Sequence, residues 1–395
     1  MVYAGPEPFP EWSMVMRNRA GASPICVVGR TPVMCLTAAC GMLALASSVS
    51  AQSITSIGLP PGGSFSGASA VSARGSAVAA NVDMATGYRW TSSGLVDIGT
   101  PRGAYATSAE DISSHGSVMV GSIFFSFPEE TARAHRWTAS GGLQDLGVLP
   151  GGVASVGSGV SGDGNSVTGY SFDENFNTIA FRWTPGGGMV SLGTLPGGWT
   201  SEGRKVSRDG STIVGMAGTP EGDRAFVWTQ SGGMGDLGLL SPDDGSSSAY
   251  GVSGDGTVVA GFSGANAVIW TNGIVQEIGG LPNATNSIAY TLSDDGSVVG
   301  GYSFFGFEAT ATLWSQSLGT VDLNTYLPTL GVDLTGWELD YTRDISADGT
   351  TIVGEGLFNG EPRGWVVKLN SSITVLAQRK MDPMQSVAAS QPHHD

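Results

Sequence analysis

Residues 161–198 read SGDGNSVTGYSFDENFNTIAFRWTPGGGMVSLGTLPGG, and close copies of this stretch recur along the chain. The stretch opens with a Ser-Gly-Asp-Gly turn, since Asp and Gly both tolerate the left-handed backbone of a tight hairpin. A β-branched run at 166–170 and the Phe181-Arg-Trp183 segment predict buried strands. A strand ending in Leu-Gly and a Pro-Gly-Gly break at 196–198 complete the unit. The unit therefore consists of strands and turns.

The unit occurs seven times, and a Trp marks its register. The Trp positions are 47, 46, 45, 42, 44 and 51 residues apart: Trp90, Trp137, Trp183, Trp228, Trp270, Trp314 and Trp365. Each follows a Ser-x-Asp-Gly turn or its relic, beginning at Ser72, Ser113, Ser161, Ser207, Ser253, Ser293 and Ser346. The first two copies carry Arg74 and His115 in place of the Asp. Four antiparallel strands per repeat of about 40–50 residues are typical of propeller blades. We predict an all-β protein, a β-propeller of about seven four-stranded blades, in which a helix has no place.

The two ends of the repeat region complement each other. The seventh copy ends near Leu369 after three strands, whereas residues 54–63 copy the missing fourth strand and its Pro-Gly-Gly break. We expect this N-terminal strand to complete the last blade and close the ring, because closure covers two exposed strand edges. An open array with half a repeat at each end is the alternative.

The first 51 residues have the order of a cleaved secretory signal. Arg residues precede an apolar stretch at 33–46, and small residues lead to a predicted cut before Gln52. About 14 apolar residues are fewer than the roughly 20 of a membrane-spanning helix. We expect a secreted or periplasmic protein. The predicted parts are a signal peptide (1–51, with Met16 as an alternative start), a propeller (52–369) and a disordered tail (370–395).

The cysteine positions and the net charge limit which kinds of site and partner the chain can have. Cys26, Cys35 and Cys40 all lie before residue 52, so the predicted mature chain has no disulfide or thiolate metal site. A lipid anchor on Cys40 is an alternative, but Thr37 occupies a position where such signals usually carry Leu. The formal charge of −16, from 34 acidic and 18 basic residues, opposes the counterion release on which nucleic-acid binding depends. We therefore expect no nucleic-acid partner.

Together, the Leu-Gly-x-Leu-Pro-Gly-Gly, Ser-x-Asp-Gly and Ala-Phe-x-Trp elements resemble the repeats of the bacterial extracellular HAF-repeat family. The resemblance covers about residues 54–369, and it implies an exported repeat protein without a defined activity. The His of the family's His-Ala-Phe is replaced in the better copies by Ile179, Arg224, Asn266 and Thr310. No role is therefore assigned to that His.

The loops of one rim are the candidate binding site. Up-and-down strands place the Ser-x-Asp-Gly and Gly-Gly turns on one rim, and the Pro-Gly-Gly connections and the loops before each Trp on the other. The second rim varies between copies and combines aromatic with acidic residues, which suits a glycan or protein partner. The candidate residues are Phe124, Phe125, Phe127, Glu129, Phe172, Phe176, Phe304, Phe305, Phe307 and Phe358. Alternatively, these Phe side chains pack against the neighbouring blade.

We predict no catalytic residue, metal or cofactor, and a monomeric, noncatalytic binding scaffold. His115 and His135 are the only His of the repeat region, and one Asp per turn cannot supply the six to eight oxygens of a calcium site. Two carboxylate pairs, at 243–244 and 294–295, would suit glycoside cleavage. An extracellular polysaccharide hydrolase or lyase, and a purely structural envelope or matrix protein, are the alternatives. An enzyme would show repeat-breaking polar residues near the central channel, whereas the copies look fairly uniform. The Trp residues are expected in the core between blades.

Overall fold

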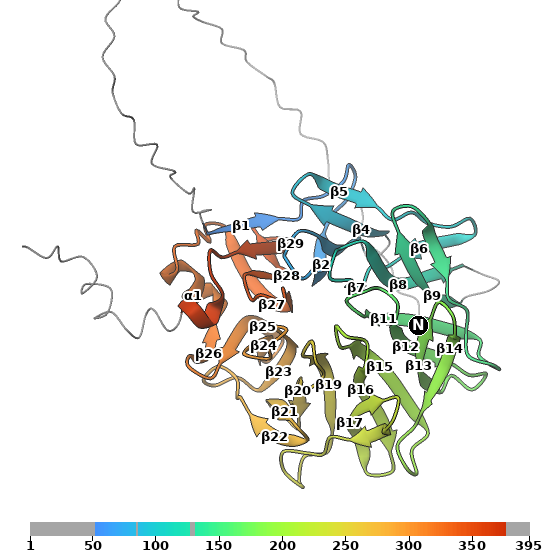
Figure 1. The fold of residues 1–395 in the computed structure, drawn as a ribbon. Helices are drawn as coiled ribbons and strands as arrows, with labels where there is room; N and C mark the ends of the chain where they lie inside the picture. Colours follow the sequence, from blue (N-terminus) through green and yellow to red (C-terminus); the bar gives the residue numbers. More distant parts are fainter. Residues whose placement is uncertain (1–51, 84–85, 127–130, 377–395) are drawn as a thin grey trace, which may run out of the picture. The chain divides into compact units, whose positions relative to one another are not determined.

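The computed structural model describes residues 52–83, 86–126 and 131–376, which form a ring of seven antiparallel sheets (Figure 1). The strands of each blade are given from the innermost outward: blade I has β2 (Ser66–Val71), β3 (Val78–Val82), β4 (Thr86–Thr91) and β5 (Gly94–Asp97), and blade II has β6 (Ala104–Thr107) with β7 (Asp111–Ile112), β8 (Val118–Phe125), β9 (Ala132–Thr138) and β10 (Gly142–Asp145). Blade III has β11 (Ala154–Val160), β12 (Val167–Phe172), β13 (Thr178–Thr184) and β14 (Gly188–Gly193), blade IV has β15 (Thr200–Val206), β16 (Thr212–Thr219), β17 (Gly222–Thr229) and β18 (Gly233–Asp236), and blade V has β19 (Ser247–Val252), β20 (Val258–Ser263), β21 (Asn266–Thr271) and β22 (Ile274–Glu277). Blade VI has β23 (Asn286–Leu292), β24 (Val298–Phe305), β25 (Glu308–Ser315) and β26 (Gly319–Asp322), and blade VII has β27 (Trp337–Ile345), β28 (Thr351–Phe358), β29 (Glu361–Lys368) and β1 (Ser53–Ser56). The predicted seven-bladed propeller is confirmed.

The N-terminal strand completes blade VII. β1 pairs antiparallel with β29, from Ser53 opposite Lys368 to Ser56 opposite Trp365. The Ile57 amide then donates to the Gly364 carbonyl at 2.9 Å. The predicted ring closure is therefore confirmed, and the outer edge of β29 is covered.

The core is divided into seven apolar clusters, one at each interface between adjacent blades. Each cluster contains one of the seven repeat Trp residues. Between blades II and III, for example, Trp183 packs with Val118 and Val120 of the preceding blade. Burying one such large apolar side chain contributes roughly 1.5–3 kcal/mol. The Trp residues thus hold the blades together, as the repeat pattern predicts.

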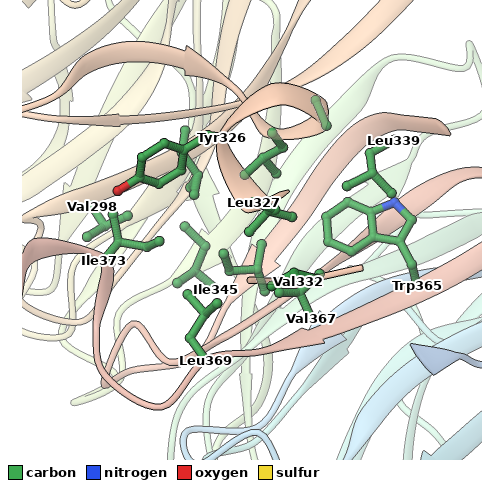
Figure 2. Packing of buried hydrophobic residues seen from close by; sticks show 14 residues of the cluster. Val298, Tyr326, Leu327, Val332, Leu339, Ile345, Trp365, Val367, Leu369 and Ile373 are labelled. Carbon is green, nitrogen blue, oxygen red and sulfur yellow. The ribbon is translucent and has the colours of Figure 1, made fainter. Parts of the chain in front are cut away.

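A short helix, α1 (Leu323–Thr329), lies between blades VI and VII, and the expectation of no helix was wrong (Figure 1). The longest Trp spacing, 51 residues, supplies the extra chain. The Asp322 side chain caps α1 by accepting from the Asn324 amide at 2.8 Å. Leu327 is fully buried in the same cluster as Trp365 (Figure 2). Ile373 also packs there, so the packed region extends past the predicted boundary at residue 369.

The Ser-x-Asp-Gly turns close one end of the central channel. In blade III the Ser161 hydroxyl donates to the Asp163 carboxylate at 2.6 Å, and Gly164 has a φ of +74°. Seven backbone hydrogen bonds of 2.9–3.3 Å join these turns around the axis, each running from one blade to the next. We call this circle the turn ring; it joins Ala73, Ser114, Gly162, Arg208 with Asp209, Gly254, Asp294 and Ala347.

Some predicted features lie outside the described residues. These are the signal peptide, the C-terminal part of the predicted tail (377–395), and two candidate loop residues, Phe127 and Glu129. Within the described residues, no helix has the length and apolar character needed to cross a membrane.

Candidate functional site

The innermost segment of each blade presents one side chain to the channel, three residues before the Ser of the following turn; in blade II this segment is the gap between β6 and β7. These side chains, here called the channel ring, are Ser69, Glu110, Ser158, Arg204, Tyr250, Tyr290 and Arg343. All seven line one cavity of about 430 Å³. The uniformity expected from the sequence therefore fails at this position, because repeat-breaking polar and aromatic residues converge in the channel.

A β-bulge directs the ring side chains inward. In blade III, Gly157 pairs with Gly169 and Gly159 pairs with Thr168, which leaves Ser158 without a partner. The same register shift occurs at the ring position of blades I, IV, V, VI and VII. A bulge leaves its extra residue outside the ladder. Gly169 permits the close approach, since a Cβ there would lie 1.9 Å from the Val156 carbonyl oxygen.

Blades IV to VII contribute an aromatic and cationic wall. The Arg204 guanidinium lies 4.4 Å from the centre of the Tyr250 ring, and Tyr250 stacks on Tyr290 at 5.2 Å. The Arg343 guanidinium lies 5.3 Å from the Tyr290 ring centre. Cation–π contacts of this kind hold both guanidinium groups and rings in place. Blades I to III contribute only two hydroxyls and one carboxylate to the ring, so the two sides differ in bulk and polarity.

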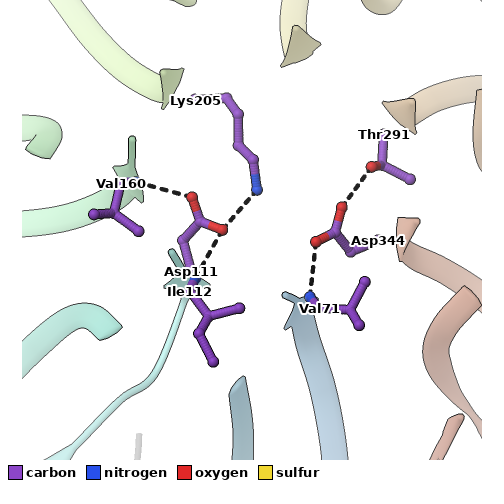
Figure 3. Close-up of polar contacts among 7 residues, drawn as sticks. All are labelled: Val71, Asp111, Ile112, Val160, Lys205, Thr291 and Asp344. Carbon is purple, nitrogen blue, oxygen red and sulfur yellow. Dashed lines mark hydrogen bonds and ion pairs between the residues drawn. The ribbon is translucent and has the colours of Figure 1, made fainter. Parts of the chain in front are cut away.

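An ionic layer of Lys205 with the buried Asp111 and Asp344 lies between this cavity and the turn ring, and Figure 3 shows its contacts. The Lys205 ammonium lies 2.8 Å from Asp111, whose other carboxylate oxygen accepts from the Val160 amide. Asp344 accepts from the Val71 amide and the Thr291 hydroxyl. Desolvation lowers the pKa of Lys205, but Asp111 and Asp344 outweigh it and raise the pKa above its ordinary value. The layer separates the cavity from a smaller one, about 80 Å³, on the side of the turn ring.

One contact from blade I and one from within blade II position the ring residue Glu110. The Asn81 side chain of blade I bonds to both the amide and the carbonyl of Ala109, at 2.8 and 3.0 Å. His135 of blade II lies 2.8 Å from the Ser108 carbonyl through Nε2. Burial lowers the pKa of His135 to about 4, so near neutral pH the neutral ring donates this hydrogen bond. The backbone that carries Glu110 is therefore held from two sides.

The Glu110 side chain itself is exposed to the channel. Desolvation by the surrounding protein nevertheless raises its pKa, while a hydrogen bond from Ser108 and the charge of Arg343 act in the opposite direction. Among the described residues, no Lys, Arg or His lies within ion-pair distance of it.

A second cavity of about 690 Å³ continues from the ring toward blades I, II and VII. It shares Ser69, Glu110, Tyr290 and Arg343 with the first, and we call the two cavities together the channel mouth. Its further lining residues are Phe65, Phe124, Asp340, Tyr341, Glu355 and Arg363, among others. The Arg343 guanidinium bonds to Glu355 at 2.8 Å. Desolvation, with Glu338 and Glu355, raises the pKa of Asp340 to about 6.

The structure does not gather the predicted loop residues into one site. Phe124 lines the channel mouth, and Phe125 is partly buried. Three others pack on rings of their own blades, as Tyr170–Phe172, Tyr302–Phe304 and Trp337–Phe358 pairs with centroids 4.7–5.4 Å apart. Phe176, Phe305 and Phe307 are exposed. Binding through the loops remains a prediction.

The predicted carboxylate pairs take part in turn contacts. Asp294 forms an ion pair with Arg208 at 2.8 Å, and Asp295 accepts from the Ser293 hydroxyl. Asp244 accepts from the Ser263 hydroxyl at 2.7 Å. In the part of the chain that the structure describes, no group of three or more His, Cys, Asp or Glu side chains could hold a metal ion.

Comparisons with known proteins support the fold. No family model and no curated protein matches the chain. An oligogalacturonate lyase from Vibrio parahaemolyticus is 10% identical, with a TM-score of 0.53 over 80% of this chain and 93% of that one. A TolB from Acinetobacter baumannii is 14% identical over 64% of this chain and 61% of that one, with a TM-score of 0.43. A putative TolB from Agrobacterium tumefaciens is 13% identical over 80% and 96%, also at 0.43. The likeness to the lyase, at 10% identity, concerns the fold alone, and nothing is inferred from the two others.

Proposed function

We propose that this chain is an exported, noncatalytic propeller that binds a saccharide in the channel mouth. One observation carries the location of the ligand, though not the absence of catalysis: all seven blades direct a side chain that breaks the repeat into one cavity. A protein with a purely structural role needs no such variation at this position, since the rest of each repeat already provides the strands and the core. A ligand that touches every blade differently does need it.

The size and chemistry of the channel mouth fit a polyhydroxylated ligand. Its two cavities, about 430 and 690 Å³, lie in the range of small-ligand sites, whereas a protein partner needs a surface of roughly 800 Å². The hydroxyls of Ser69, Ser158 and the ring tyrosines can donate and accept, and Glu110 accepts only. Tyr rings add apolar area with a polar tip. This mixture complements a sugar, which has hydroxyl groups around apolar ring faces.

A polysaccharide hydrolase or lyase is the second candidate, because repeat-breaking polar residues do converge near the channel. Binding without turnover is favoured for two reasons. The ring cations are paired with acids, as in Arg204–Glu202 and Arg343–Glu355. The carboxylate pairs predicted for glycoside cleavage contact turns instead. The lyase among the structural neighbours is too distant in sequence to transfer its activity.

A glycan array tests the proposal with two matched variants of the purified protein. We expect Tyr290→Ala to weaken binding at least about tenfold, because a buried aromatic anchor of a site is typically worth more than 1.4 kcal/mol. Phe176→Ala, an exposed aromatic on a rim loop, should bind as the unchanged protein does. Equal unfolding midpoints would confirm that both variants are folded.

Three outcomes would contradict the proposal. Loss of binding only in Phe176→Ala would return the site to the loops. Cleavage of a bound glycan, seen by mass spectrometry, would make the protein an enzyme. Absence of binding to any glycan would favour a purely structural role.

A further inference from the structure

The cations of the channel are already neutralised. Arg204 lies 3.5 Å from Glu202, Arg343 lies 2.8 Å from Glu355, and Lys205 lies 2.8 Å from Asp111. Lys205 is also within the field of Asp344. The Arg363 guanidinium, at the outer edge of the mouth, donates to the carbonyls of Ser64 and Pro362. An anionic ligand would therefore have to displace an internal carboxylate from Arg204, Arg343 or Lys205, and only Arg363, at the outer edge, has no acid partner among the described residues.

Carboxylates are in excess over these cations. Glu110 and Asp340 line the mouth, and no described cation forms an ion pair with either. The charge of Arg343 lowers the pKa of Glu110, but its guanidinium is bonded to Glu355. One guanidinium therefore balances the charge of two carboxylates. Five carboxylates (Glu110, Glu202, Asp340, Asp344 and Glu355) and four cations (Arg204, Lys205, Arg343 and Arg363) line the mouth, which leaves it one formal negative charge when all are ionised. This charge is screened less than on an open surface because protein surrounds it. It attracts a cation, repels an anion and contributes little for a neutral group.

The surroundings of Glu110 fit an ammonium group. An ammonium has three donors and no acceptor. Glu110 offers a carboxylate, and Ser69 and Ser158, which flank it in the ring, offer hydroxyl oxygens. Asn81 and His135 fix the backbone at 108–109, so little order has to be gained on binding. The remaining ring positions carry Tyr250 and Tyr290, whose rings suit the sugar itself, and two arginines that are each paired with an acid.

We propose that the saccharide bound in the channel mouth carries a protonated amino group, and that Glu110 is its ion-pair partner. This inference rests on the proposed function and names its ligand class, an amino sugar with a free amine. Glu110 selects the amine, and the aromatic wall of blades IV to VII contacts the sugar rings. Acetylation of the amine removes the charge and the preference.

Calorimetry of the purified protein with three tetrasaccharides tests this proposal. The probes are a glucosamine tetramer, its N-acetylated counterpart and the neutral glucose tetramer with the same β-1,4 linkage. We expect the glucosamine tetramer to bind about tenfold more tightly than either of the others, as a charge-assisted hydrogen bond implies. Glu110→Gln, which keeps the shape of the side chain, should remove the difference. Glu174→Gln, at an exposed carboxylate in a rim loop, should preserve it.

The outcomes separate this inference from the function on which it rests. Equal binding of all three tetramers, or tighter binding of the uncharged ones, would overturn the amine preference and leave saccharide binding intact. Failure of all three to bind would contradict saccharide binding itself. Spermidine that binds as tightly as the glucosamine tetramer would show that charge alone is recognised, which would also overturn the inference. The ligand comparison on the unchanged protein does not depend on how Glu110→Gln folds.

Discussion

The two ends of the channel are built on opposite principles. At the turn ring the seven copies agree, and they contribute backbone groups that bond from blade to blade. At the channel mouth the copies disagree, and they contribute four different residue types, Ser, Glu, Arg and Tyr, at a single register position. Residues that are alike in all repeats form the blades and the turn ring, here called the frame. Residues that differ between repeats at a fixed position form the site. Changes to the frame should therefore lower stability, whereas changes to the mouth should alter binding.

The largest expected effect comes from breaking the frame at its closure. Deletion of residues 52–58 removes the pairing of four β1 residues with β29, the hydrogen bond from the Ile57 amide to the Gly364 carbonyl, and the Ile57 contacts between blades VII and I. At about 1 kcal/mol per bond and roughly 2 kcal/mol for each buried Ile, the free energy of unfolding should fall by about 5 kcal/mol or more. Urea unfolding followed by Trp fluorescence measures it.

Rescue in trans is the control for this deletion. A synthetic peptide of residues 52–63 should restore the unfolding midpoint in a concentration-dependent manner. An unchanged midpoint in the deletion variant would show that ring closure contributes no stability.

A medium effect is expected at His135, which belongs to the frame but holds a mouth residue. Its pKa is about 4 in the fold and near 6.5 when unfolded, so the unfolded state binds the proton first. The stability linked to neutral His135 is complete above pH 6.5 and is lost as pH falls toward 4, by about 3 kcal/mol. His135→Gln, which keeps a donor but does not titrate, should flatten the curve of unfolding free energy against pH. Parallel curves for the two proteins would refute this.

The smallest effect is expected at Asp340, in the mouth, and it has the opposite sign. Its pKa is about 6 in the fold and near 3.9 when unfolded, so stability falls as pH rises from 4 to 6 and the loss persists above pH 6. Because the carboxyl is only partly buried, solvent screening reduces the effect to about 1 kcal/mol. Asp340→Asn should be more stable than the unchanged protein at pH 8 and equal at pH 4. Glu338→Gln should recover part of the gain.

The frame could be predicted because each of its signals is local and repeated. The Trp spacing predicts the repeated strands, the Asp-Gly turns predict the hairpins, and the copied strand at 54–58 predicts the ring closure. The helix α1 was missed because its Leu323 and Leu327 match no repeat, although the 51-residue spacing marked the place. The other five Trp spacings lie between 42 and 47 residues, and this evenness favoured a chain made of strands alone.

The channel ring could not be predicted from a motif, because its residues are recognised only by how the repeats differ from one another at one position. The prediction follows aromatic loop residues such as Phe176, whereas Tyr290 lies within a strand and Glu110 lies just before β7, and neither carries a local signal. The bulge that places Tyr290 in the channel depends on a strand pairing that no single copy displays. Aligning the seven copies on the turn Ser and comparing the residue three places earlier would have exposed the ring.

The pairing of β1 with β29 also has a mechanical consequence. Ser53 lies opposite Lys368, so the segments that flank the propeller leave the strand pair from the same end. A force that pulls these segments apart would peel the pair open one bond at a time instead of shearing all of them together. Tension along the chain would thus open the ring at blade VII first.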